Sequence, residues 1–367
     1  VPDYCKVLTE KYILSNLQGL LEKADQDIYL KIAQVITNLS YQDNLGEVLV
    51  LGGIVGIVQN LFGASQKYDI YYYCMLTMNN IGPVLQGPEA ELALKILMSC
   101  TKRIDVARNY QNACFAIDIF VNFSRLLQYA TLLCEEGVLP LFIHTLEAYM
   151  TLDMMGKICE GFVNLSCTRK NRREIASSGI AGHLDKIFTM GSPGMRAHIL
   201  SMVGNLLSSG FFHDKIARDD AIKPMMSDML DPAQPKQFTA VAFVISQLAQ
   251  VQTSAIVMVR CNAIQIILGM LREAPVESQT YLWTLLAALS QQPIFFEKMV
   301  CERGLVLEMY KEVLNENSKQ IELVVQLAYN LSIHENLSDW LAQDLVEMFV
   351  ELLKTIFSNS PYPLKAT

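Results

Sequence analysis

The chain has 367 residues, more than one compact core usually holds, and no Gly/Ser-rich, Pro-rich or single-sign charged linker divides it, which favours one continuous architecture. Hydrophobic residues make up 51%, yet the most apolar stretches, 240–248 and 281–289, are too short to cross a membrane, so the apolar surface must face protein. A net charge of −8 argues against the general phosphate-binding surface that nucleic acids need, so no nucleic-acid partner is expected. The short apolar stretches predict that no transmembrane segment is present.

The N-terminal residues show no basic region followed by an apolar region and a cleavage site, so no secretory signal is expected. Val1 to Tyr4 match the end of a common epitope tag, so these residues are either a tag remnant or native sequence. The chain has nine cysteines without a CxxC pair, and most lie within apolar helical patterns. This usage indicates reduced thiols and a cytoplasmic or nuclear location.

A period of 41 or 42 residues runs along the chain. It is marked by a column of eight positions, six of them asparagine: Asn38, Asn80, Asn122, Asn164, Asn205, Gln247, Ala288 and Asn330. Apolar or small residues lie six and two positions before each, and an apolar residue follows each, so these three positions share one face of a helix. Each unit is therefore predicted to contain a helix of about 14 residues that carries the column position and buries this face.

A second column consists mostly of small residues: Gly53, Lys95, Gly137, Gly179, Ala221, Ala263, Gly304 and Val346. Around it, two shorter amphipathic segments meet at a bend, and glycine permits the backbone angles of such a corner. Each unit is predicted to be a short helix, a corner, a second helix, a polar loop and a third helix. Lys95 departs from the pattern, which leaves the geometry of its unit open.

These units fill the chain as a single domain, 1–367. Their predicted boundaries are 1–42, 43–85, 86–126, 127–169, 170–210, 211–252, 253–293 and 294–335, followed by a partial unit, 336–357, and a tail, 358–367. No unit can bury its apolar face alone, whereas stacked units can.

The motifs Asn164-Leu165-Ser166, Asn171-Arg172 and Gly179-Ile180 resemble those of the armadillo (ARM) repeat family, and Glu136 to Leu141 is similar to the family's entry into the second helix. The resemblance covers nearly the whole chain. It implies an all-α fold, a right-handed α-solenoid superhelix of about eight three-helix repeats with a truncated C-terminal capping repeat. HEAT repeats have a comparable period but two helices and no asparagine column, so they rank second.

In ARM proteins the third helices line a concave groove, and the asparagine amides bind the main chain of an extended peptide. The resemblance assigns this role to Asn38, Asn80, Asn122, Asn164, Asn205 and Asn330. The alternative is that the amides brace neighbouring helices, and both interpretations stay open. Ala288 cannot bind in either way, so the predicted site centres on the second to fifth units, with Asn80, Asn122, Asn164 and Asn205.

Four other residues complete the predicted groove. Asp118 and Glu160 lie one helical turn before the asparagine in adjacent units, where they would favour a Lys or Arg of the partner or be two solvated charges. Tyr72, in Tyr71-Tyr72-Tyr73, is expected to anchor a partner or to pack in the core, and Phe243 shares the register of Asp118. Nuclear-import adaptors of the importin-α kind have tryptophan at this register, and its absence argues against nuclear-localisation peptides.

No HExxH, P-loop, GxGxxG or GxSxG motif is present, and the five histidines lack metal-ligand spacing, so no enzyme activity, cofactor or metal is expected. His144 is expected to be a partly buried structural residue. The sequence predicts a non-catalytic scaffold or adaptor that holds an extended segment of a partner protein. Two alternatives are a chaperone or assembly factor, suggested by Tyr72, Phe243 and Met154-Met155, and a structural component of a cytoskeletal or ciliary assembly.

Overall fold

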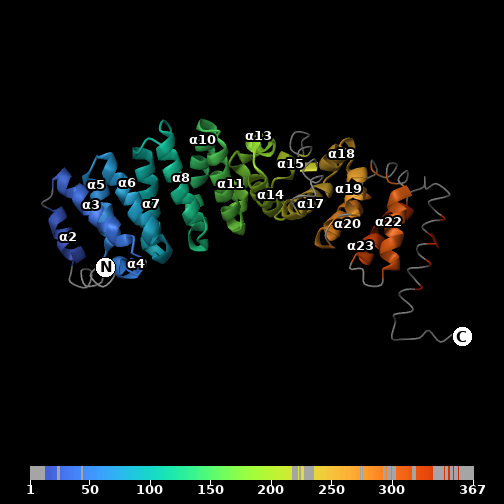
Figure 1. Ribbon diagram of the computed structural model, residues 1–367, viewed down its shortest axis with the longest axis horizontal. Helices are drawn as coiled ribbons and strands as arrows, with labels where there is room; N and C mark the ends of the chain where they lie inside the picture. The colour runs from blue at the N-terminus through green and yellow to red at the C-terminus, as the bar shows by residue number, and fades with distance from the viewer. Residues whose placement is uncertain are drawn as a thin grey trace, which may run out of the picture. The chain divides into compact units, whose positions relative to one another are not determined.

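The computed structural model describes residues 13–216 except 23, 24 and 43, residues 235–333 except short segments between 273 and 319, and single positions among 222–226 and 343–354. Within these residues every regular element is a helix, which confirms the all-α prediction (Figure 1). The chain divides into two compact units, Val1–Ile180 and Ala181–Thr367. The single domain 1–367 stays a prediction. The tag-like Val1 to Tyr4, the corner Ala221, most of the partial unit 336–357 and the tail 358–367 lie outside the described residues.

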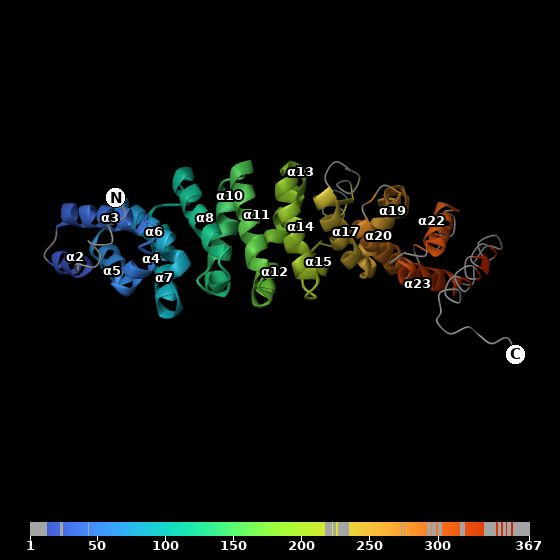
Figure 2. The same ribbon diagram turned by 60° about the horizontal axis from the view of Figure 1, so that its bottom comes forward.

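The N-terminal unit is a series of packed helices. In chain order they are α2 (Ile13–Leu21), α3 (Gln26–Ser40), α4 (Gly46–Leu51), α5 (Ile54–Ala64), α6 (Tyr68–Ile81), η1 (Gly82–Val84), α7 (Gly87–Arg103), α8 (Tyr110–Ser124), η2 (Leu127–Tyr129), α9 (Ala130–Glu135), α10 (Val138–Ala148), α11 (Leu152–Ser166), η3 (Arg169–Asn171) and α12 (Arg172–Ser177). Helices α3, α6, α8 and α11 carry the asparagine column, and each packs against the next (Figures 1 and 2).

The C-terminal unit repeats this arrangement. After η4 (Ile180–His183), which spans the boundary, come α13 (Leu184–Met190), α14 (Pro193–Leu207), α15 (His213–Ile216), α17 (Pro235–Ala249), α18 (Gln252–Arg260), α19 (Ala263–Leu271), α20 (Val276–Leu289), α22 (Arg303–Leu314) and α23 (Ile321–Ser332). Helices α14, α17, α20 and α23 carry the later column positions and pack in that order. The helices that carry the column in the two units are called the third helices below.

Polar caps explain where several third helices begin. The side chains of Asp25, Asn109, Thr151 and Ser192 accept hydrogen bonds from backbone N–H groups in the first turns of α3, α8, α11 and α14. Each cap satisfies N–H groups that have no partner within the helix. Because the caps recur at the same register, the third helices begin in step with the sequence period.

The core consists of the three apolar columns that the sequence predicts. Every residue six and two positions before the column position, and every residue directly after it, is at most 6% exposed. The columns include the large side chains of Phe120, Phe123 and Phe162, which are almost fully buried. The burial pattern confirms the predicted face of each third helix.

Three predicted corners contain a left-handed glycine. Gly53, Gly137 and Gly179 have φ angles of 86°, 92° and 99°, a conformation in which a Cβ atom is strained. In the seventh unit the left-handed residue is Asn262 (φ 55°), so the corner lies one residue before the predicted Ala263. At Lys95 the predicted corner is absent, because α7 runs without a break through that position from Gly87 to Arg103.

None of the helices in the described part of the chain is long and apolar enough to span a membrane by itself. The helical segments 240–249 and 252–260 together have the length and apolar composition of a span, but they are bent by 119° at the break between them.

Candidate partner-binding surface

The asparagine column forms hydrogen bonds between neighbouring third helices. Asn80 Nδ2 donates to Ser40 Oγ at 3.0 Å, and Asn164 Nδ2 donates to Ser124 Oγ at 2.9 Å. Each serine lies two residues after the column position of the preceding unit. An asparagine amide has two N–H donors and a carbonyl oxygen, so this bond leaves one N–H and the carbonyl of Asn80 and Asn164 without a partner in the described chain. Bracing and ligand binding are therefore compatible at these two half-buried residues.

Asn122 has fewer free groups than Asn80 and Asn164. Asn122 is exposed, donates to Asn79 Oδ1 at 3.3 Å and accepts from Arg125 Nη1 at 3.2 Å. Asn205 lies half-buried on α14 in the C-terminal unit.

Asn330 has a structural role. It is 6% exposed, its Nδ2 donates to Ser290 Oγ and Ala287 O, and its Oδ1 accepts from Gln326. Both N–H groups of the amide are used within the chain and the residue is buried, so the binding role assigned to Asn330 is wrong.

The predicted acidic residues, Asp118 and Glu160, form ion pairs with cations of the same chain. Lys157 Nζ lies 2.9 Å from Asp118 Oδ1 and 3.3 Å from Asp153 Oδ2, and Arg125 Nη2 lies 2.6 Å from Glu160 Oε1. Burial disfavours the charged form of Lys157, but the hydrogen bonds and charges of the two aspartates outweigh burial and raise its pKa. Asp118 and Glu160 therefore pair with Lys157 and Arg125 of the chain itself. This pairing replaces the expectation that the two carboxylates attract a partner's Lys or Arg.

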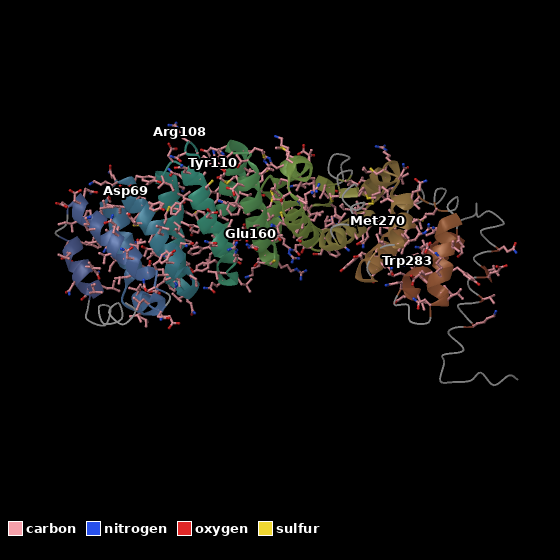
Figure 3. The ribbon with its side chains drawn as sticks, viewed as in Figure 1. Asp69, Arg108, Tyr110, Glu160, Met270 and Trp283 are labelled. Atoms are coloured by element: carbon pink, nitrogen blue, oxygen red, sulfur yellow. The ribbon has the colours of Figure 1, made fainter. Side chains whose placement is uncertain are left out.

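Asp69 on α6 is an acidic residue that was not among the predicted site residues. Its carboxylate is exposed and forms no ion pair or hydrogen bond with the residues that the structure describes. Tyr72 and Tyr73 follow it by three and four residues, so they lie on the same side of the helix. The side chains of Asp69 and of Tyr110 on α8 are labelled in Figure 3. A charge column at this register, Asp27, Asp69 and Asp153, was the signal in the sequence that could have found it.

The three tyrosines of α6 have different roles. Tyr71 is buried, and its hydroxyl donates to Ser65 O and accepts from Arg103 Nη1. Tyr72 is half-buried and stacks on Phe115 of α8, with ring centroids 4.4 Å apart. Tyr73 Oη accepts a hydrogen bond from Gln34 at 3.4 Å. Tyr72 and Phe115 therefore form a partly open aromatic surface beside Asp69.

Two of the observations that suggested the chaperone alternative lose their weight. Met154 and Met155 are completely buried, so they cannot form an adaptable surface. Phe243 is half-buried, its ring meets Tyr281 at 5.7 Å, and it lies so close to Gly204 that an added Cβ there would approach it to 2.8 Å. Phe243 thus packs mainly against α14 and α20.

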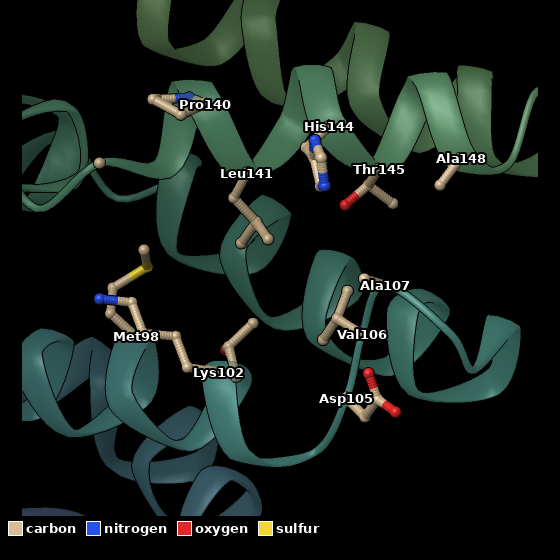
Figure 4. Close-up of a pocket in the computed structure, with 12 residues that line it drawn as sticks. Met98, Lys102, Asp105, Val106, Ala107, Pro140, Leu141, His144, Thr145 and Ala148 are labelled. Atoms are coloured by element: carbon tan, nitrogen blue, oxygen red, sulfur yellow. The ribbon is translucent and has the colours of Figure 1, made fainter.

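A hollow of about 350 Å³ lies between α7, the loop after it and α10 (Figure 4). Met98, Val106 and Leu141 provide apolar walls, and Lys102 and Asp105 also line it. The sequence pattern did not predict this hollow. Its only signal was Lys95, because the loss of a corner there lengthens α7 and places the next turn at Asp105, which has a φ angle of 55°.

No group of three His, Cys, Asp or Glu side chains that could hold a metal lies within the described residues. His144 lines the hollow but its side chain is 75% exposed, so the expectation of a partly buried histidine is wrong.

Cysteine reactivity is expected to follow burial. Burial raises the pKa of the Cys100, Cys134 and Cys159 thiols to about 12, against an ordinary value of 9.0. At about pH 9, only about one in a thousand of these thiols is ionised, and the thiolate is the form that reacts. Iodoacetamide should therefore modify the exposed Cys167 before these three buried thiols, as measured by mass spectrometry of digested protein. Equal labelling of the buried thiols in the folded chain would contradict this expectation.

No protein-family model and no curated protein matches the sequence. Among solved structures, the chain is similar to the crystal structure of an engineered protein from the Northeast Structural Genomics Consortium. The TM-score is 0.63 with 12% sequence identity, over 95% of this chain and 95% of that chain. At this identity the likeness concerns the fold alone.

Proposed function

We propose that the chain is an armadillo-type α-solenoid that acts as a non-catalytic scaffold or adaptor, with an extended segment of a partner protein held along its third helices. The observation that carries the proposal is that two column amides have hydrogen-bonding groups without a partner in the described chain. Asn80 and Asn164 each use one N–H for a brace to the preceding unit and keep one N–H and the carbonyl oxygen. A peptide main chain offers one donor and one acceptor per residue, which matches these free groups.

The surface around α6 favours a basic side chain in the bound segment. Asp69 has no cation of its own in the described chain, and the half-buried Tyr72 and Phe115 lie one turn further along and on the adjacent helix. A lysine or arginine there would gain the carboxylate and an aromatic face together. The predicted attraction for Lys or Arg is thus moved from Asp118 and Glu160 to Asp69.

A cytoplasmic or nuclear location belongs to the same proposal. Every cysteine within the described part of the chain is a free thiol. Free thiols, several of them buried, are typical of proteins in a reducing compartment.

The test begins with selection of random linear peptides on the immobilised chain. Selected peptides are expected to contain Lys or Arg, and their affinity is measured by fluorescence anisotropy. An Asn80→Ala/Asn164→Ala variant should bind about tenfold more weakly, equivalent to about 1.4 kcal/mol, because both amides lose their free donor and acceptor. Asp69→Asn should weaken only the peptides that contain Lys or Arg.

Asn60→Ala is the matched control, since Asn60 is exposed on α5 and does not belong to the column. Thermal unfolding of the double variant establishes that the solenoid remains folded without the two braces. If the folded double variant binds the selected peptides as tightly as the unmodified chain does, the proposal is wrong.

A further inference from the structure

Helix α3, the first third helix among the described residues, has an apolar face that these residues leave uncovered. Leu20, Ile28 and Val35 are 54%, 42% and 39% exposed. They line a hollow of about 390 Å³ between α2 and α3. Large aliphatic side chains that lie together in this way mark an interaction surface more often than isolated exposed residues do.

The same register is covered in the later units. One period after Ile28 and Val35 lie Ile70 and Thr77, and both are completely buried. The cover is the preceding third helix, because Thr37 Oγ1 of α3 lies 2.8 Å from Thr77 Oγ1 of α6. The open face of α3 therefore has the shape that receives another third helix.

A hydrogen-bond donor is also unused at this face. Asn38 is exposed, and its amide makes no hydrogen bond with the described residues, whereas Asn80 and Asn164 each donate to a serine about one period earlier. By analogy with Asn80 and Asn164, the group that would suit the Asn38 amide is a serine hydroxyl on another third helix.

The last third helix, α23, carries the complementary groups. Ser332 Oγ donates to Tyr329 O at 2.8 Å, just as Ser40 donates to Thr37 O and Ser290 donates to Ala287 O. Ser40 and Ser290 are buried and accept from a column asparagine, whereas Ser332 is exposed and accepts from none in the described chain. Tyr329, at the register of Thr37, is 58% exposed.

We propose that two copies of this chain associate head to tail, with α23 of one copy packed on α3 of the next. Asn38 then donates to Ser332 of the second copy, and the ring of Tyr329 covers Val35. Such a contact joins two different surfaces, so it adds further copies into a ring or an open filament. The association uses the ends of the third-helix series and does not depend on the proposed peptide binding.

The test uses the full chain in sedimentation velocity from about 1 to about 200 µM, where contacts of modest area associate. The unmodified chain should form larger species as its concentration rises. Val35→Glu and Tyr329→Glu should each weaken this association at least tenfold, because each places a charge in an apolar contact. Since both residues are exposed, circular dichroism should show little change in folding.

Mixing the two variants gives the decisive result. The Val35→Glu variant keeps its α23 surface and the Tyr329→Glu variant keeps its α3 surface, so an equimolar mixture should form dimers and nothing larger. Leu127→Glu is the control, because Leu127 is 76% exposed away from both faces and its replacement should leave association unchanged.

Two results would overturn the proposal. If the Tyr329→Glu variant still forms dimers and the Val35→Glu variant does not, two α3 faces contact each other. If the unmodified chain stays monomeric throughout, either other residues of the chain or a different protein covers α3.

Discussion

Replacing Phe162 by alanine is expected to lower the free energy of unfolding of the N-terminal unit by about 3–5 kcal/mol. Phe162 is completely buried on α11, where its ring meets that of Phe142 on α10 at 5.7 Å in an edge-to-face arrangement. The substitution removes both the buried apolar surface and this contact, and the surrounding helices can close the cavity only in part. Urea unfolding followed by circular dichroism measures the change.

Leu127→Ala is the matched control for Phe162→Ala. Leu127 is 76% exposed in the same unit, so its truncation should change the free energy of unfolding by no more than about 0.5 kcal/mol. Equal effects of the two substitutions would show that burial at the predicted columns does not hold the unit together.

Replacing Asn171 by alanine is the second large expected effect, a loss of about 1–3 kcal/mol. Asn171 is only 2% exposed, and its Nδ2 donates to Ala130 O at 2.8 Å and to Leu165 O at 3.1 Å. Ala130 belongs to α9, 41 residues earlier, so the amide ties two successive units together. Alanine leaves two buried carbonyl groups without this donor. Thermal or urea unfolding of the variant measures the loss.

Asn171→Asp tests whether the donor matters more than the shape. Aspartate has nearly the same shape, but as a carboxylate it accepts hydrogen bonds and cannot donate to the two carbonyl groups. It should destabilise the unit at least as much as alanine does, because it also places a charge in a buried position. A stable Asn171→Asp variant would contradict the role given to the amide.

The core was predictable because burial follows register. The residues six and two positions before each column position and directly after it share one helix face, and that face meets the next unit wherever a third helix forms. No knowledge of individual contacts is needed to name Ile36 or Phe162 as core residues. The all-α class and the positions of the third helices follow from the same periodicity.

The details of the corners could not be read from composition alone. A small residue marks a corner only by its frequency, and asparagine also adopts the left-handed conformation at modest cost. The column therefore pointed to Ala263, whereas the bend uses Asn262. At Lys95, the sequence indicated a departure but not its form, which is a continuous α7.

The ion pairs of Asp118 and Glu160 were missed because their partners belong to neighbouring units. Lys157 reaches Asp118 from 39 residues away, and Arg125 reaches Glu160 from 35 residues away. A list of the acidic residues on one helix face does not contain these cations. Asp27, Asp69 and Asp153 share one register, and two of them pair with Lys67 and Lys157, whereas Asp69 has no cation in the described chain.

The brace between column asparagines and preceding serines bears on how the gene for this chain can change in length. Asn80 and Asn164 each donate a hydrogen bond to a serine 40 residues earlier, and that serine lies on the adjacent third helix. Duplication or deletion of a whole unit would therefore bring an equivalent asparagine and serine together again, since each unit contacts only its neighbours. A partial insertion within a third helix would turn the asparagine away from its serine. Evolution of such a chain should therefore favour steps of whole units.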